Sequence, residues 1–324
     1  MLAVLGIDIA KDSFQAALVC AGSQRSGSFS NDRQGFKKLS RWLSKREVEQ
    51  LHACMEATGR YWEELAFYLH EQGHKVSVVN PARIHHYAKS QLARNKTDKL
   101  DAEIIARFCQ REEPAAWSPP RPEVRELQAL TRHLQVLEGN RTQESNRLAS
   151  GIPSDDVRAL LQQHLQFLEG QIAELKERIQ EHINKHPTLK QQRDLLESIP
   201  GIGDLTAAVL LGENIQSFAS ARSLAAYAGL NPRLHLSGTS VRGKPTLSKT
   251  GNSHIRRALY FPAITAARFN PIICRFCGRL KERGKHNMVV IGAAMRKLLC
   301  LAFGVLKSGV PFDPDYATET HPVS

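Results

Sequence analysis

The chain has 324 residues, enough for about two domains of ordinary size, and 42% of them are hydrophobic, which is ample material for a buried core. The net charge of +12 and a pI of about 9.6 favour a polyanionic partner over a merely soluble surface. Between residues 190 and 310 there are 18 Lys or Arg and 5 Asp or Glu, so this segment carries the excess positive charge.

Neither a signal-peptide pattern nor an uninterrupted apolar run of 18 residues is present, which argues against secretion and against a membrane partner. The six cysteines have no framework spacing, and a reducing cytoplasm fits them best. Cys274 and Cys277 form a C-x-x-C pair without a second pair or nearby histidines, so we interpret them as helix-borne rather than zinc-binding, at about five to one. We therefore expect a cytoplasmic protein.

The first 110 residues alternate between strand and helix patterns. Three strands are predicted first, then a helix, a strand, a helix, a strand and a last helix opened by proline, at residues 2–9, 13–19, 26–31, 36–43, 51–56, 61–72, 75–79 and from 81 onwards. This order is that of a ribonuclease H-like domain. The predicted fold class is therefore α/β in the first part of the chain.

Two acidic residues close predicted strands that are otherwise apolar. Asp8 follows the apolar run 2–5, and Glu56 follows the strand 51–55. A carboxylate in such a strand costs free energy unless it is paired or holds a metal ion. We therefore expect both residues to belong to a functional site.

Asp98 and Asp101 stand three residues apart where a helix is predicted to begin after Thr97. In the structural interpretation they complement the helix dipole and Thr97 caps the helix, which for this pattern alone is favoured about three to one. The basic residues around the pair and the two upstream acids shift the balance toward a functional site. Four carboxylates from separate segments that meet at one sheet edge can hold two divalent cations for phosphoryl chemistry.

The middle of the chain is predicted to be helical. Residues 114–122 contain four prolines and are interpreted as a linker. Leucines and isoleucines then repeat at heptad spacing, which predicts a coiled-coil seam, at Leu161, Leu168 and Leu175 and at Leu165, Ile172 and Ile179. Two interpretations stay open at about even odds, namely a hairpin within one chain and subunit assembly.

A turn with the sequence Ile-Pro-Gly-Ile-Gly, residues 199–203, separates two predicted helices. Such a turn exposes backbone N–H groups at a helix start, where a DNA phosphate binds well. The alternative is a glycine-stabilised turn without a ligand. Because the surroundings are basic, we favour phosphate contact at Gly201 and Gly203, at about three to one.

A segment rich in hydroxyl groups, glycine and positive charge follows at residues 236–251. The structural interpretation is a solvated loop that touches phosphate. A serine beside glycine leaves room for a phosphodiester, and nearby cations can neutralise the transition state. Asn252 or Ser253 is predicted to cap the next helix, which presents His254 and two arginines. The predicted nucleic-acid contacts here are Arg242, Lys244, Lys249, Arg256 and Arg257.

Taken in order, these motifs resemble the insertion-element transposases that have an N-terminal DEDD domain similar to the RuvC resolvase and a C-terminal serine-bearing domain. These relatives of the Piv invertase are also described as bridge RNA-guided recombinases. The resemblance rests on GIDIAKD, MEATG, NKTDKLDA, IPGIG, and LSGTSVRG with SKTGN. It implies that Asp8, Glu56, Asp98 and Asp101 bind Mg²⁺ and that Ser237 attacks DNA, with Ser240 and Ser248 as rivals.

The resemblance further implies a bacterial protein that associates with the nucleoid when bound to DNA, and a non-coding bridge RNA that pairs with donor and target DNA. We expect a homo-oligomer, dimer or tetramer. The expected domains are a catalytic domain (1–113), a linker with a helical coiled coil (114–190) and a mostly helical transposase domain with a helix-hairpin-helix-like element (191–324). The leading hypothesis is a transposase or recombinase. The alternatives are a metal-dependent junction resolvase or nuclease that acts by hydrolysis, and a nucleic-acid-binding protein with a vestigial catalytic fold.

Overall fold

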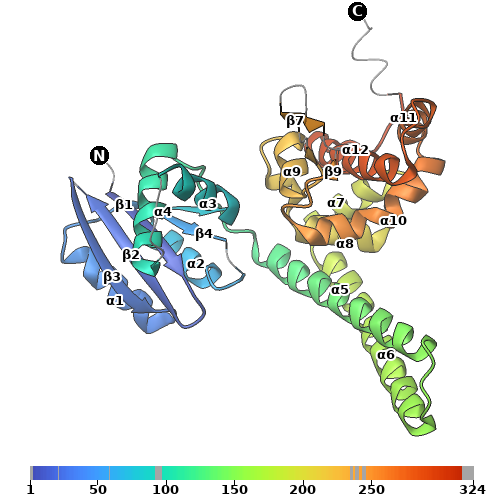
Figure 1. Ribbon diagram of the computed structural model, residues 1–324, viewed down its shortest axis with the longest axis horizontal. Helices are drawn as coiled ribbons and strands as arrows, with labels where there is room; N and C mark the ends of the chain where they lie inside the picture. Colours follow the sequence, from blue (N-terminus) through green and yellow to red (C-terminus); the bar gives the residue numbers. More distant parts are fainter. Residues whose placement is uncertain are drawn as a thin grey trace, which may run out of the picture. The chain divides into compact units, whose positions relative to one another are not determined.

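The computed structural model describes residues 3–20, 22–57, 59–91, 97–233 and 246–315, and the backbone alone of residues 236–237 and 241–242. The chain divides into two compact units, Met1–Pro119 and Pro120–Ser324 (Figure 1). Each unit has a hydrophobic core of its own.

The first unit is built on one five-stranded sheet, with strands β1 (Ala3–Ile9), β2 (Ser13–Cys20), β3 (Ser23–Ser30), β4 (Leu51–Glu56) and β5 (Lys75–Val79). The strand order is β3-β2-β1-β4-β5, in which β1, β2 and β3 are antiparallel and β4 and β5 run parallel to β1. This is the ribonuclease H-like arrangement that the sequence predicts.

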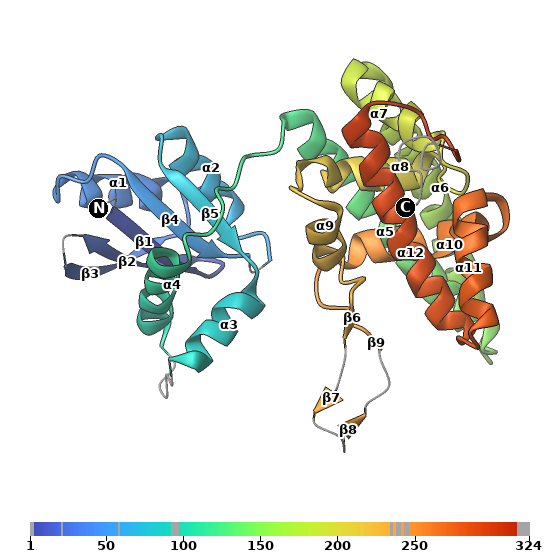
Figure 2. The ribbon, with the colours of Figure 1, turned by 90° about the horizontal axis from the view of Figure 1, so that it is seen from above.

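Helices cover both faces of this sheet. One face packs on α1 (Arg33–Ser44) and α2 (Glu63–Glu71), and the other on α3 (Pro81–Ser90) and α4 (Asp98–Glu112) (Figure 2). The helix starts follow from local chemistry, because the Asp32 carboxylate and the Asn80 side chain each accept a backbone N–H bond, and Pro81 occupies the first turn of α3. β1 is buried on both faces and is therefore almost wholly apolar.

The proline-rich segment after α4 is partly docked on the first unit. The Ser77 hydroxyl lies 2.9 Å from the carbonyl oxygen of Pro114 and 2.8 Å from Nε2 of His52. The backbone N–H of Trp117 donates to the carbonyl of Val76 at 2.7 Å. The indole ring of Trp117 packs edge-on against Trp62 and Phe67. The first unit therefore extends to residue 119, six residues beyond the predicted boundary.

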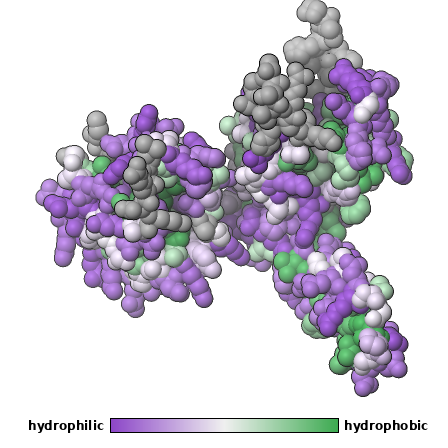
Figure 3. Space-filling view, in the orientation of Figure 1, coloured by the Kyte–Doolittle hydropathy of each residue, from purple (hydrophilic) through white to green (hydrophobic). Residues whose placement is uncertain are grey.

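Helices α5 (Pro122–Ala149) and α6 (Asp155–Lys185) pack against each other as a hairpin. The heptad residues of α6 are buried within the chain, except that Leu165 is half-buried. Three apolar side chains near the far end of the hairpin are exposed, Val157 (37%), Leu160 (64%) and Phe167 (61%), and Figure 3 shows apolar surface there. The structure thus contains the intrachain hairpin and leaves an apolar patch on α6.

The rest of the second unit is mostly helical, with α7 (Pro187–Glu197), α8 (Asp204–Gly212), α9 (Ala221–Tyr227), α10 (Ser253–Phe269), α11 (Pro271–Glu282) and α12 (Asn287–Ser308). These helices share one hydrophobic core with the base of the hairpin, so the predicted boundary at residue 190 does not separate two cores. Cys274 is exposed and Cys277 is buried, both on α11.

Helix α12 has the length and apolar composition of a membrane span. Half of that apolar window is buried inside the second unit, where α12 packs against α10 and α11. A core helix of a globular unit passes the same test of length and composition. Its apolar character is thus accounted for by packing.

Candidate active site

Asp8 and Glu56 stand side by side at the carboxyl ends of two neighbouring parallel strands. Ile7 of β1 is the register partner of Met55 of β4, so the next residues along, Asp8 and Glu56, are level with each other. Both are half-buried.

The two carboxylates point to the sheet face that α4 covers. Side chains alternate along a strand, so Asp8 shares a face with Gly6, and Glu56 shares a face with Cys54. Cys54 belongs to the core cluster of α4, and a Cβ atom on Gly6 would lie 2.2 Å from the carbonyl oxygen of Ala102. The opposite face, with Ile7 and Met55, packs on the cluster of α1 and α2.

The other two predicted ligands lie in the first turn of α4. Thr97 caps this helix, since its hydroxyl accepts the N–H of Leu100 at 3.3 Å. Asp98 is exposed and Asp101 is half-buried. The contact between Gly6 and Ala102 brings the start of α4 to the strand that carries Asp8.

Among the described residues, which include all four carboxylates, no three His, Cys, Asp or Glu side chains are grouped closely enough to hold one metal ion. The structure therefore brings Asp8 and Glu56 together on one face and places Asp98 and Asp101 on the covering helix. It does not gather the four as one ligand set.

A basic helix that the sequence interpretation did not single out begins at the same sheet edge. Glu56 pairs with Val79, the last residue of β5, and α3 starts two residues later. Its exposed side chains include Arg83, His85, His86 and Lys89, and none of them is acidic. The sequence signal for this basic helix is a run of seven residues, 83–89, with four basic or imidazole side chains and no acid.

Residues 236–251, called the serine-bearing segment below, are held by a short strand pair and a hydrogen bond beside it, which we call the stem. Strands β6 (Pro232–Arg233) and β9 (Thr246–Leu247) pair antiparallel, and the N–H of Ser248 donates to the carbonyl of Asn231 at 2.9 Å. Beyond them β7 (Leu236–Ser237) pairs with β8 (Val241–Arg242), with Ser237 opposite Val241. Figure 2 shows β7 and β8 farther from the helices than β6 and β9.

Four of the candidate residues in this segment have no described side chain. For Ser237 and Arg242 the backbone alone is described, while Ser240 and Lys244 lie outside the described residues. The remaining rival serine, Ser248, is half-buried in the stem of the segment.

The predicted basic contacts near the stem differ in their surroundings. Lys249 is exposed. One nitrogen of the Arg256 guanidinium donates to the carbonyls of Ala228 (2.9 Å), Gly251 (3.2 Å) and Asn252 (3.0 Å). Arg256 therefore tethers backbone at the end of the segment, whereas Arg257 is exposed and donates once, to the carbonyl of Gln135.

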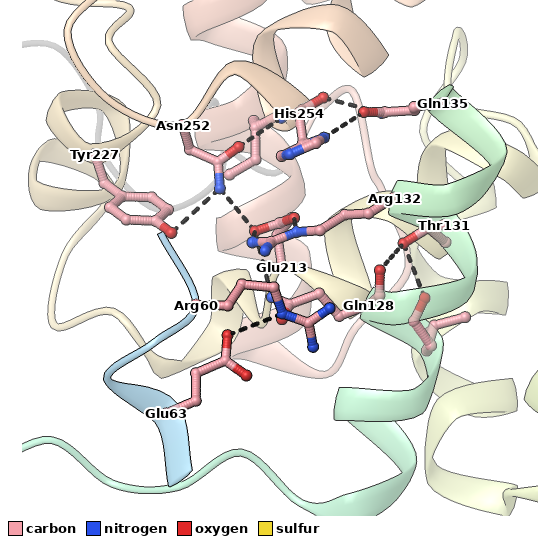
Figure 4. A network of polar contacts seen from close by, with 12 residues as sticks. Arg60, Glu63, Gln128, Thr131, Arg132, Gln135, Glu213, Tyr227, Asn252 and His254 are labelled. Atoms are coloured by element: carbon pink, nitrogen blue, oxygen red, sulfur yellow. Dashed lines mark hydrogen bonds and ion pairs between the residues drawn. The ribbon is translucent and has the colours of Figure 1, made fainter. Parts of the chain in front are cut away.

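Near the start of α10, a buried carboxylate and its hydrogen-bond partners connect four helices, α5, α8, α9 and α10 (Figure 4). Glu213, which follows α8 and is 5% exposed, accepts two hydrogen bonds from Arg132 of α5 and one of 2.7 Å from the Asn252 side chain. Asn252, one of the two residues predicted to cap α10, is the cap, and its side chain also donates to the Tyr227 hydroxyl of α9 at 3.2 Å. The sequence interpretation missed Glu213, although it is one of 5 acids among residues 190–310.

The Ile-Pro-Gly-Ile-Gly turn packs closely on α10. Gly201 has a φ of +106°, and a Cβ atom there would lie 2.7 Å from Cβ of Ala266. Gly203 directly precedes α8, and a Cβ atom there would meet nothing within 4 Å. Burial and the neighbouring Asp204 raise the pKa of Glu197 to about 7. These carboxylates add negative charge beside the N–H groups predicted to bind phosphate.

The fold and the paired carboxylates define a ribonuclease H-like enzyme with an acidic sheet edge, joined to a basic helical unit. Two family models match the chain, the DEDD transposase of IS110 over residues 5–152 and the transposase family IS116/IS110/IS902 over residues 193–277. The chain belongs to this family of transposases. It is thus a transposase or DNA invertase, an enzyme that cuts and rejoins DNA.

Relatives match along nearly the whole chain. The pilin gene-inverting protein of Moraxella bovis is 37% identical over 316 residues, covering 95% of this chain and 97% of that protein. The transposase for insertion sequence element IS1328 of Yersinia enterocolitica is 28% identical over 358 residues, covering 95% and 98%. A solved structure, T. thermophilus RuvC in complex with a Holliday junction substrate, aligns with 36% of this chain and 99% of that chain, at 13% identity and a TM-score of 0.27.

Proposed function

We propose that this enzyme recombines donor and target DNA with a serine nucleophile, and that Asp8, Glu56, Asp98 and Asp101 hold Mg²⁺. The observation that carries the proposal is the level placement of Asp8 and Glu56 on the sheet face covered by α4. Carboxylate oxygens are the donors that Mg²⁺ prefers. Bound there, the ion would activate a nucleophile and neutralise charge on the phosphate.

Ser237 is the proposed nucleophile, because it precedes a glycine in a segment whose stem is anchored. In the proposed step its Oγ bonds to phosphorus while the bond from phosphorus to a deoxyribose oxygen breaks. The serine proton passes to a carboxylate or to solvent, and the departing oxygen takes up a proton. The serine ester conserves the phosphodiester energy, so a second strand can reverse the step and become joined.

The proposal includes a non-coding bridge RNA as guide and a homo-oligomer, dimer or tetramer. The RNA rests on the resemblance carried by the motifs. The positive charge between residues 190 and 310 supports polyanionic partners, and the exposed apolar patch of α6 supports contact between subunits. Nucleic-acid contacts are proposed at the turn and in the serine-bearing segment, through Gly201, Gly203, Arg242, Lys244, Lys249, Arg256 and Arg257.

The second candidate is hydrolysis by a metal-dependent junction resolvase or nuclease. It is favoured by the fact that all four carboxylates belong to the first unit, while the serine belongs to the second. Water would then replace serine as the nucleophile, and no protein–DNA ester would form.

Denaturing gels of reactions with Mg²⁺ and element-end DNA, run with and without the adjacent non-coding RNA, distinguish the two. We expect an RNA-dependent covalent protein–DNA adduct in the wild type, and its loss in Ser237→Ala with DNA and RNA binding retained. An adduct that persists in Ser237→Ala and disappears in Ser240→Ala or Ser248→Ala assigns the other serine. Recombined or cleaved product without any adduct favours hydrolysis.

A further inference from the structure

Helix α10 has one buried apolar face and one exposed face that combines arginine with phenylalanine. Its buried residues lie at helical spacing, at Ile255, Leu259, Ala263 and Ala266. The opposite side is exposed and carries Arg257, Phe261, Thr265, Arg268 and Phe269. We call these five residues the α10 face.

The two phenylalanines of the α10 face are unusually accessible. Phe261 is 74% exposed and Phe269 is 69% exposed, the highest values among the exposed large apolar side chains of the described residues. Neither ring is needed for the core of the second unit, which lies on the other side of the helix. Two accessible aromatic rings on one helix indicate a binding surface.

Charge around the α10 face favours a polyanion as its occupant. From Ser253 to Lys281 the sequence contains no acidic residue and six Lys or Arg. Arg257 and Arg268, and Arg275 and Arg279 on α11, are exposed. Among the described residues none of these four forms an ion pair with a carboxylate. A second copy of this chain is disfavoured, because two such basic faces would repel each other.

We infer that the α10 face binds unpaired nucleotides of a single-stranded nucleic acid, with Phe261 and Phe269 stacking on bases and the arginines contacting phosphates. Phenylalanine donates no hydrogen bond, so it contributes little to recognition of a duplex backbone, whereas an unstacked base offers a π-face to any ring. This inference rests on nucleic acid as the proposed partner and does not depend on which nucleophile is used.

Fluorescence anisotropy of the full-length protein with a labelled 20-nucleotide oligo(dT) and with a 20-base-pair duplex tests the inference. We expect Phe261→Ala with Phe269→Ala to weaken oligo(dT) binding roughly 10-fold to 100-fold and duplex binding less than 3-fold. The slope of affinity against salt should not change in this variant, whereas Arg268→Ala should reduce it by about one ion.

Two further variants separate stacking from other roles. Val310→Ala removes an exposed apolar side chain that lies after α12 and outside both the α10 face and the α6 patch, at 52% exposure, and should leave oligo(dT) binding unchanged. Phe261→Trp should retain binding and gain fluorescence that oligo(dT) quenches. Equal loss of duplex and single-strand affinity, or no loss in the double variant, overturns the inference. A lower oligomeric state of the double variant, by light scattering, with unchanged oligo(dT) affinity assigns the face to a second copy instead.

Discussion

The Glu213 carboxylate accepts two parallel hydrogen bonds from the Arg132 guanidinium, at 2.7 Å from Nε and 2.9 Å from Nη2. The two residues are 81 positions apart, and the Glu213 side chain is 1% exposed. Through Asn252 the same carboxylate is linked to the cap of α10, directly after the serine-bearing segment. One buried ion pair thus fixes the end of the segment that carries the proposed nucleophile.

Arg132→Met should destabilise the second unit by about 3 kcal/mol, because it leaves a buried carboxylate without its cation. Arg178→Met breaks the exposed ion pair with Glu174 and should cost about 0.5 kcal/mol or less. The three tryptophans, Trp42, Trp62 and Trp117, all lie in the first unit. In Arg132→Met, the melting temperature measured by circular dichroism should therefore fall, while the melting temperature measured by tryptophan fluorescence should not change. Equal decreases for Arg132→Met and Arg178→Met would contradict the prediction.

Gly6→Ala should destabilise the first unit by more than about 3 kcal/mol, because the added methyl group meets the backbone of α4 at 2.2 Å. Gly170→Ala in α6 is the matched control, since a Cβ atom there meets nothing within 4 Å. That substitution should be neutral or stabilise the helix by about 0.5–1 kcal/mol. Tryptophan fluorescence during urea unfolding measures the first effect, and an unchanged midpoint for Gly6→Ala would show that α4 packs elsewhere.

Asp8→Asn should reduce Mg²⁺-dependent strand cleavage by at least about 1,000-fold while leaving DNA binding and the fold intact. The control is Asp12→Asn, an exposed acid four residues later. Isothermal titration calorimetry with Mn²⁺ in place of Mg²⁺ supplies a second measurement. Asp8→Asn and Glu56→Gln should each weaken binding of the ion. Wild-type cleavage by Asp8→Asn would remove this residue from the site.

The raised pKa of Glu197, about 7 in the folded protein against 4.5, makes the stability of the second unit depend on pH. The folded state holds the proton more tightly, so its contribution is fully present below pH 4.5 and is lost as pH rises to about 7. Glu197→Gln should abolish this loss. The melting temperature of the variant should exceed that of the wild type increasingly from pH 5 to pH 7.5, whereas Glu177→Gln on an exposed part of α6 should show no such trend.

Local patterns carry the parts of this architecture that depend on neighbours in sequence. The strand that ends at Glu56, the cap at Thr97 and the cap at Asn252 follow from spacing and side-chain chemistry, and the structure contains them. The heptads of α6 do not distinguish a hairpin from subunit assembly, because an apolar seam has the same sequence pattern whichever helix covers it.

Contacts between distant segments account for what the sequence did not reveal. No local signal shows that Arg132 pairs with Glu213, or that Ser77 and Trp117 hold a proline-rich segment that composition alone assigns to a linker. The placement of Asp98 and Asp101 relative to Asp8 likewise depends on the crossing of α4 over the sheet, which a helix pattern does not determine.

The docking of the chain along β5 also protects the sheet against association with other sheets. β5 is an apolar edge strand, and the hydrogen bond from Trp117 to Val76 occupies backbone that would otherwise be free to pair. The opposite edge, β3, is rich in serine and carries Arg25, which makes it a poor template for a further strand. A fragment that ended at residue 113 would uncover β5 and become prone to aggregation, so the smallest soluble form of the first unit extends through Trp117.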